Sequence, residues 1–142
     1  MKKRTIILAI FILVFVIMFF PVSSTHNISG NGDVLNVQKE KIGECKLDIE
    51  ITEISSLIIC YKKCFAFTID GKSTKEFSTN SHAKAKGICL ISQMYYDKDI
   101  DAMHLCSLIY NEDYSYAVLD LGANYYFINN GSDIAYDELP VS

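Results

Sequence analysis

The sequence predicts an α+β protein in which one helix packs on an antiparallel, meander-rich β-sheet stabilised by disulfides. Three observations lead to this prediction. Short apolar stretches with a two-residue period recur along the C-terminal part of the chain, separated by turn residues, as in antiparallel sheets. Residues 54–65 instead repeat apolar side chains at intervals of three and four, which is typical of a helix. Five cysteines follow an N-terminal export signal, so an oxidising environment is expected.

The chain begins with a signal peptide or a membrane anchor. Basic residues at positions 2–4 precede fifteen uninterrupted apolar residues, Ile6–Phe20, and small residues follow. This order is typical of a secretory signal, and the run is shorter than the roughly 20 residues that span a bilayer. We expect residues 1–24 to be a signal peptide cleaved after Ser24, with an uncleaved N-terminal anchor as the alternative. Both interpretations export residues 25–142.

Charge excludes several classes of partner for the exported part. Without positions 1–24 the chain has ten lysines, no arginine and seventeen acidic residues, a net charge of −7 compared with −4 for the whole sequence. Surfaces that bind nucleic acid rely on arginine and a positive field. We therefore expect no nucleic-acid partner, and contact with a membrane only if the N-terminal segment is uncleaved.

The first part of the exported chain is predicted to be a flexible leader, residues 25–43, before a single domain, residues 44–142. Polar residues and Gly30-Asn31-Gly32 favour the leader. Residues 46–52 then alternate between apolar and polar side chains, which predicts a half-buried strand with one wet face.

A helix and a hairpin are expected next. Residues 54–65 form the predicted helix, and Ser55 or Ser56 can cap its start. Residues 65–69 alternate up to Asp70-Gly71, a hairpin turn signal, and residues 72–77 are the candidate return arm. The polar stretch 78–87 is predicted to be a loop. Further strands are expected at 88–96, 104–110, 114–121 and 125–128, with a short one at 134–136.

The cysteines suggest two disulfides and one remaining thiol. Cys60 and Cys64 would lie one turn apart on the predicted helix, where side chains are parallel and bond poorly to each other. Each would reach to the sheet, and Cys89 and Cys106 on predicted strands are the expected partners, in an order that the sequence leaves open. Cys45 would stay unpaired or join two chains in a disulfide-linked dimer.

No catalytic residue, cofactor or metal site is predicted. His104 with the cysteines at 60, 64 and 106 offers zinc-ligand atom types, but their spacing is not that of a zinc motif. Residues 97–101 begin like a calcium loop but lack its glycine and its final glutamate. The histidines are expected to be surface or packing residues. Two N-glycosylation sequons begin at Asn27 and Asn130.

Tyrosine supplies the basis for a functional hypothesis. Tyrosine is enriched at protein interfaces, and alternation would place one member of each adjacent pair on the surface. We expect a secreted glycoprotein that acts as an extracellular protein-interaction module and has no enzymatic activity. The alternative is a carrier of a small apolar ligand in a pocket between helix and sheet. The expected interaction surface comprises Tyr110, Tyr114, Tyr116, Tyr125 and Tyr126.

Overall fold

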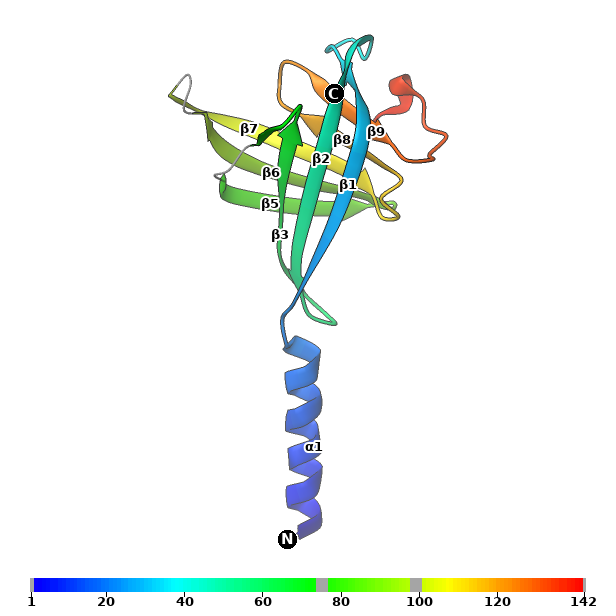
Figure 1. Cartoon of the computed structure of the whole chain (residues 1–142). Helices are drawn as coiled ribbons and strands as arrows, with labels where there is room; N and C mark the ends of the chain where they lie inside the picture. The colour runs from blue at the N-terminus through cyan, green and yellow to red at the C-terminus, as the bar shows by residue number, and fades with distance from the viewer. Residues whose placement is uncertain (1, 74–76, 98–100, 142) are drawn as a thin grey trace.

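The computed structural model describes residues 2–73, 77–97 and 101–141. An N-terminal helix, α1 (Lys2–Phe19), projects away from a head formed by β-strands (Figure 1). From Ile6 onward the side chains of α1 are apolar on every side of the helix, and no residue of α1 is buried. Among the described residues, no helix combines the length and the apolar character required to cross a membrane.

Within the described residues, the head is one antiparallel sheet of nine strands. Three hairpins join the first four strands in succession, and a meander joins the last five. The strand order across the sheet is β4-β3-β2-β1-β9-β8-β7-β6-β5. The strands are β1 (Val22–Leu35), β2 (Lys41–Ser55), β3 (Cys60–Ile69), β4 (Lys72–Ser73), β5 (Phe77–Ala85), β6 (Ile88–Asp97), β7 (Ala102–Asn111), β8 (Tyr116–Asp120) and β9 (Tyr125–Asn129).

The sheet rolls up so that β1 to β3 cross over β5 to β7 (Figure 1). Aliphatic and aromatic side chains from both layers fill the space between them, including Leu47, Ile49, Phe65, Ile91 and Leu108. The roll brings β3 beside β5 and β6, although β3 and β6 are not neighbours in the hydrogen-bonded order. The interior is therefore a packed core between two layers of one continuous sheet.

One buried side chain joins the two layers at this junction. Gln93 on β6 is 1% exposed. Its amide nitrogen donates to the carbonyl oxygen of Phe65 on β3 at 2.7 Å, and its amide oxygen accepts from the Phe65 backbone N–H at 3.3 Å. A side-chain amide thus takes the place of a neighbouring strand for this residue of β3.

A second core lies on the opposite face of β8 and β9. The C-terminal segment, with a short 3₁₀ helix (Tyr136–Glu138), packs Leu139 and Val141 over this face. Two contacts hold the segment in place. The Tyr136 hydroxyl donates to an Asp33 carboxylate oxygen at 2.7 Å, and the Lys39 ammonium donates to the Leu139 carbonyl at 2.9 Å. The sheet is consequently buried on both faces along β8 and β9.

The α+β class and the antiparallel meander are confirmed, but the predicted helix at residues 54–65 is wrong. These residues form the end of β2, a tight turn and the start of β3, in a continuous antiparallel hairpin. The Ser56 hydroxyl accepts from the backbone N–H of Ile58 and of Ile59, at 3.3 and 3.0 Å, which closes the turn. Strand pairing with the rest of the roll therefore overrides a helical spacing carried by β-branched residues.

The predicted flexible leader is also wrong, because residues 22–35 are the strand β1. Its glycines allow a close crossing rather than flexibility. A Cβ at Gly32 would lie 3.1 Å from the carbonyl oxygen of Phe127 on β9. The predicted loop at 78–87 is mostly the edge strand β5, and the short strand expected at 134–136 is replaced by the 3₁₀ turn. The hairpin turn at Asp70-Gly71 is confirmed, with both residues at positive φ.

Candidate functional site

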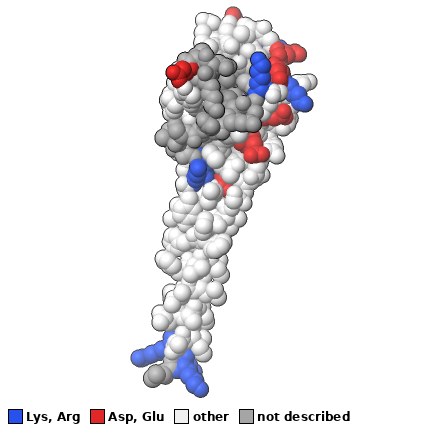
Figure 2. Space-filling view, turned by 60° about the vertical axis from the view of Figure 1, so that its left-hand side comes forward, with Lys and Arg blue, Asp and Glu red and all other residues white. Residues whose placement is uncertain are grey.

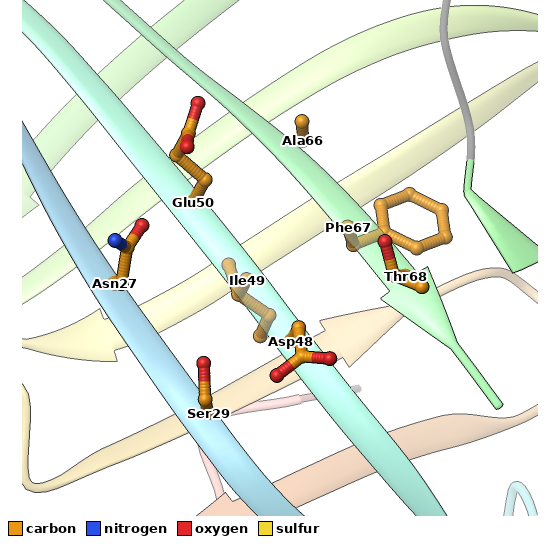
Figure 3. A pocket seen from close by; sticks show the side chains of 8 residues that line it. All are labelled: Asn27, Ser29, Asp48, Ile49, Glu50, Ala66, Phe67 and Thr68. Carbon is orange, nitrogen blue, oxygen red and sulfur yellow. The ribbon is translucent and has the colours of Figure 1, made fainter. Parts of the chain in front are cut away.

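A shallow groove runs over the outer face of β1, β2 and β3 (Figure 3). It encloses about 310 Å³. Ser29 and Ala66 are small, so the surface is hollowed between longer side chains on neighbouring strands. We call this feature the outer groove, and its lining residues are Asn27, Ser29, Asp48, Ile49, Glu50, Ala66, Phe67 and Thr68.

The outer groove is acidic and rich in hydrogen-bonding groups. Asp48 and Glu50 are two residues apart on β2, so both carboxylates point to the same face of the sheet. Neither forms a salt bridge to any residue that the structure describes. The amide of Asn27 and the hydroxyl of Thr68 flank these carboxylates on the adjacent strands (Figure 3). The groove therefore presents acceptors suited to a cationic group from a partner.

A second group of polar side chains lies at the end of the roll nearest α1. Lys63 on β3 and Glu53 on β2 form a salt bridge of 3.0 Å. Beside Lys63, Tyr110 on β7 stacks on Tyr114 with ring centroids 5.6 Å apart, and Tyr114 stacks on His26 of β1 at 4.5 Å. We call these five residues the end cluster. It replaces the aliphatic core with polar and aromatic groups at this end.

Backbone strain at Tyr114 supports a specific role for its ring. Its φ is +58°, a conformation unusual for a bulky residue, in the turn between β7 and β8. The Asn111 carbonyl accepts from the Tyr114 N–H at 2.9 Å, and the Asn111 side chain also accepts from the Tyr116 N–H at 3.0 Å. The turn is thus fixed in the geometry that lays Tyr114 over the end of the core.

Electrostatics hold Glu53, Lys63 and Tyr110 each in one protonation state near neutral pH. Burial opposes ionisation of Glu53, but the hydrogen bond and charge of Lys63 outweigh it, so the pKa of Glu53 lies below its usual value. Burial likewise opposes the charge of Lys63, and the Glu53 carboxylate overcomes it, so the pKa of Lys63 is raised. Burial raises the pKa of Tyr110 to about 12. A general base near neutrality requires a pKa close to 7, and the shifts of Glu53, Lys63 and Tyr110 all lead away from that value.

The predicted disulfide framework is not supported by the geometry. All five cysteines are free thiols in the structure. Cys64 alternates on β3 with Lys63 and Phe65, which point inward, so its side chain lies on the outer face and cannot reach Cys89 or Cys106 in the interior. The pairing was inferred from a helix that is not present. Cys45, which was predicted to stay unpaired or to link two chains, is a free thiol buried in the core.

The interior thiols have little nucleophilic character. Burial raises the pKa of Cys106 to about 12, with a smaller effect from the charge of Asp120. Burial also raises the pKa of Cys45. Since the thiolate is the reactive form, these two residues are inert near neutral pH.

Most of the predicted tyrosine surface is buried. Tyr110 belongs to the core between the layers, and Tyr116 and Tyr125 are covered by the C-terminal segment. Tyr114 and Tyr126 are half-buried against the same core. The prediction of an exposed tyrosine patch is wrong, because the face of the meander expected to meet solvent is covered by residues 134–141.

Other candidate residues are spread over the molecule. Asn130 is exposed in the turn after β9, whereas Asn27 lines the outer groove. Within the described ranges, no three His, Cys, Asp or Glu side chains are arranged to hold a metal ion. The acidic sequence 97–101 lies partly outside the described residues. His82 is exposed on β5, and His104 is half-buried on β7.

The outer groove and the end cluster differ in how far the sequence predicts them. Alternation in residues 46–52 indicates the wet face of β2 and hence Asp48 and Glu50. The contribution of β1 is hidden, since its residues resemble a polar leader. Only the roll brings His26, Glu53 and Tyr110 together from separate strands.

Comparison with family models, curated proteins and solved structures found no match for the chain.

Proposed function

We propose that the protein is an exported protein-interaction module and that the outer groove is its contact surface. The observation that supports this most directly is the pair of carboxylates, Asp48 and Glu50, in a hollow without a basic partner among the described residues. The favoured partner is an extracellular protein that presents a lysine or arginine side chain. Hydrogen bonds from such a side chain to Asn27 and Thr68 would add specificity at the rim.

Architecture also favours a displayed binding domain. The head is separated from the N-terminus by the length of α1 (Figure 1). The groove is lined by residues of β1, β2 and β3 that lie away from the strand ends adjoining the helix. The end cluster is a weaker candidate site, because Lys63 and Glu53 satisfy each other and their side chains are only 15% and 25% exposed. The carrier hypothesis placed its pocket against a helix that does not exist at residues 54–65.

Glycosylation at Asn27 and binding in the outer groove exclude each other. Asn27 lies on β1 opposite Glu50 on β2, at the edge of the groove. A glycan there would cover the carboxylates, whereas one at Asn130 would leave them open. We propose that Asn130 is the glycan acceptor of the exported protein. Mass spectrometry of the exported chain before and after deglycosylation tests this, and a glycan at Asn27 would contradict the groove as a contact surface.

Mass spectrometry of the exported protein also tests whether its cysteines form disulfides. Export into an oxidising compartment would favour bridges, although the structure holds no pair in position to form one. Alkylation of the exported protein without reduction counts its free thiols. Two disulfides would agree with the predicted disulfide-stabilised fold. Five alkylated cysteines would show that all the cysteines are free thiols.

Site-specific photocrosslinking identifies the partner. A photoreactive amino acid replaces Ser29 in the outer groove, or Ser81 on the exposed edge strand β5 as a control, in the full chain on intact cells. We expect a discrete adduct from position 29 and none from position 81. Identical adducts from both positions, or none from position 29, would refute the assignment of the surface.

Affinity measurements with the purified partner then test the carboxylates. The double variant Asp48→Asn with Glu50→Gln should weaken binding at least about tenfold, which corresponds to about 1.4 kcal/mol. The matched control, Asp133→Asn with Asp137→Asn, removes the same charge from exposed positions near the C-terminus and should leave the affinity unchanged. An equal loss in both variants would show a general charge effect and no role for the groove.

A further inference from the structure

An apolar surface surrounds the point where α1 meets the sheet. It combines the end of the helix, the first residues of β1 and the turn between β2 and β3. Its side chains are between 42% and 78% exposed, although all are large and hydrophobic. We call this surface the collar, and it consists of Phe20, Val22, Leu57, Ile58, Ile59 and Tyr61.

Specific contacts hold the collar against the helix. The Tyr61 hydroxyl donates to the carbonyl oxygen of Phe19 at 2.8 Å, which satisfies one of the free carbonyls at the C-terminal end of α1. Leu57 and Val22 share with Ile17 the lining of an apolar cavity of about 480 Å³ between helix and turn. The collar and α1 therefore form one continuous apolar surface, with the turn beside the end of the helix (Figure 1).

The length of this surface matches a bilayer better than the helix does. The fourteen apolar residues of α1, Ile6–Phe19, rise about 21 Å at 1.5 Å per residue. The hydrocarbon core is about 30 Å thick, so the helix alone falls about 9 Å short. Extended chain rises about 3.3 Å per residue, so residues 20–22, which continue from the helix, add about 10 Å. Together with the turn at 56–59 they supply the missing apolar length.

The distribution of charge along the chain also fits a bilayer that extends from the basic residues at 2–4 to the collar. After Arg4 the next charged residue is Asp33, and residues 54–61 contain none. Figure 2 shows that the stalk is uncharged from its basic tip up to the base of the head. Lys62 follows the collar directly and is exposed, at the level where lipid phosphates would lie. Tyr61, in the collar, is a residue type that is enriched at membrane–water interfaces.

We propose that α1 is retained in the exported protein and that the collar enters the outer leaflet of a lipid bilayer beside it. The head then stands on the membrane, with the turn between β2 and β3 as a second point of insertion. The basic residues at 2–4 stay on the cytoplasmic side. Cleavage after Ser24 would instead remove three residues of β1 that pair with Glu53–Ser55. It would also leave the collar residues of the turn, residues 57–59, exposed to water.

Tryptophan fluorescence tests this arrangement because the chain contains no tryptophan. The full chain is reconstituted in phosphatidylcholine vesicles with bromine atoms on the acyl chains, as the Leu57→Trp or the Val37→Trp variant. Val37 is the matched control, since it is apolar and 53% exposed in the turn between β1 and β2, at the opposite end of that hairpin. We expect the bromines to quench most of the Leu57→Trp emission and none of the Val37→Trp emission.

Two results would overturn the proposal. Emission from Leu57→Trp that is no more quenched than that from Val37→Trp would place the collar in water or against protein. If that emission also changed with protein concentration, the collar would be an interface between copies of the chain. A mature mass from native membranes that lacks Ile6–Phe20 would also refute retention of α1, whereas a mass that includes it supports the proposal.

Discussion

Replacing Gln93 by leucine should destabilise the roll more than any other polar substitution in the core. Leucine is similar in size but cannot form the two hydrogen bonds to Phe65. Its apolar atoms would fit the surrounding side chains, so the effect isolates the loss of hydrogen bonding. Among the buried residues that the structure describes, Gln93 is the one with a polar amide in the core.

The magnitude follows from the groups left without partners. The Phe65 N–H and C=O would both stay buried, and each unsatisfied group costs about 1–3 kcal/mol. Part of this is offset by the better transfer of leucine into the core, which leaves a net loss of about 2–4 kcal/mol. At about 4 °C per kcal/mol for a domain of this size, the midpoint of thermal unfolding should fall by roughly 8–16 °C.

Circular dichroism of the full chain in detergent micelles measures this change. The matched control is Gln38→Leu, because Gln38 is exposed in the turn between β1 and β2 and its side chain is not in the core. That substitution should alter stability by no more than about 0.5 kcal/mol. Equal midpoints for Gln93→Leu and the unsubstituted chain would show that the junction of β3 and β6 does not depend on this amide.

Two further predictions concern titratable groups. The pair of Glu53 and Lys63 should contribute about 1–3 kcal/mol, between the values for exposed and buried ion pairs. Because the pKa of Glu53 is lowered and that of Lys63 is raised, this stability is present between about pH 5 and pH 10. It is lost as pH falls through the pKa of Glu53 or rises through the pKa of Lys63 in the folded protein. The Glu53→Gln variant should lack this contribution to the free energy of unfolding at every pH in this range, which denaturation experiments at several pH values would measure. Separately, iodoacetamide at pH 8 should alkylate Cys64 well before Cys106, and mass spectrometry of timed samples would reveal the reverse order if the assignment of faces is wrong.

Local patterns predicted those elements whose burial alternates. The wet face of β2, the turn at Asp70-Gly71 and the strands β6 to β9 follow from a two-residue period and from turn residues. The same reasoning failed for residues 54–65, where apolar side chains recur at helical spacing. There the collar residues are apolar without being buried, so the pattern does not report which face meets the core.

Tyrosine shows a second limit of local reasoning. Tyr116 and Tyr125 lie on strands that were predicted correctly, but their exposure depends on the C-terminal segment, which packs against them from residues 136–141. No periodicity in β8 or β9 indicates that a distant segment covers their outer face. Only part of the outer groove was likewise predictable from the sequence, because β1 supplies Asn27 and Ser29 from a stretch that resembles a flexible leader.

The sequence by itself determined the apolar N-terminal stretch, the acidic charge of residues 25–142, the antiparallel meander and the acidic face of β2. These features depend on composition and on neighbours within a few residues. Tertiary structure alone decided the roll, the burial of the tyrosines, the separation of the cysteines and the meeting of Gln93 with Phe65. Each of these depends on contacts between residues far apart in the chain, whose register is fixed by packing of the whole sheet rather than by any local preference.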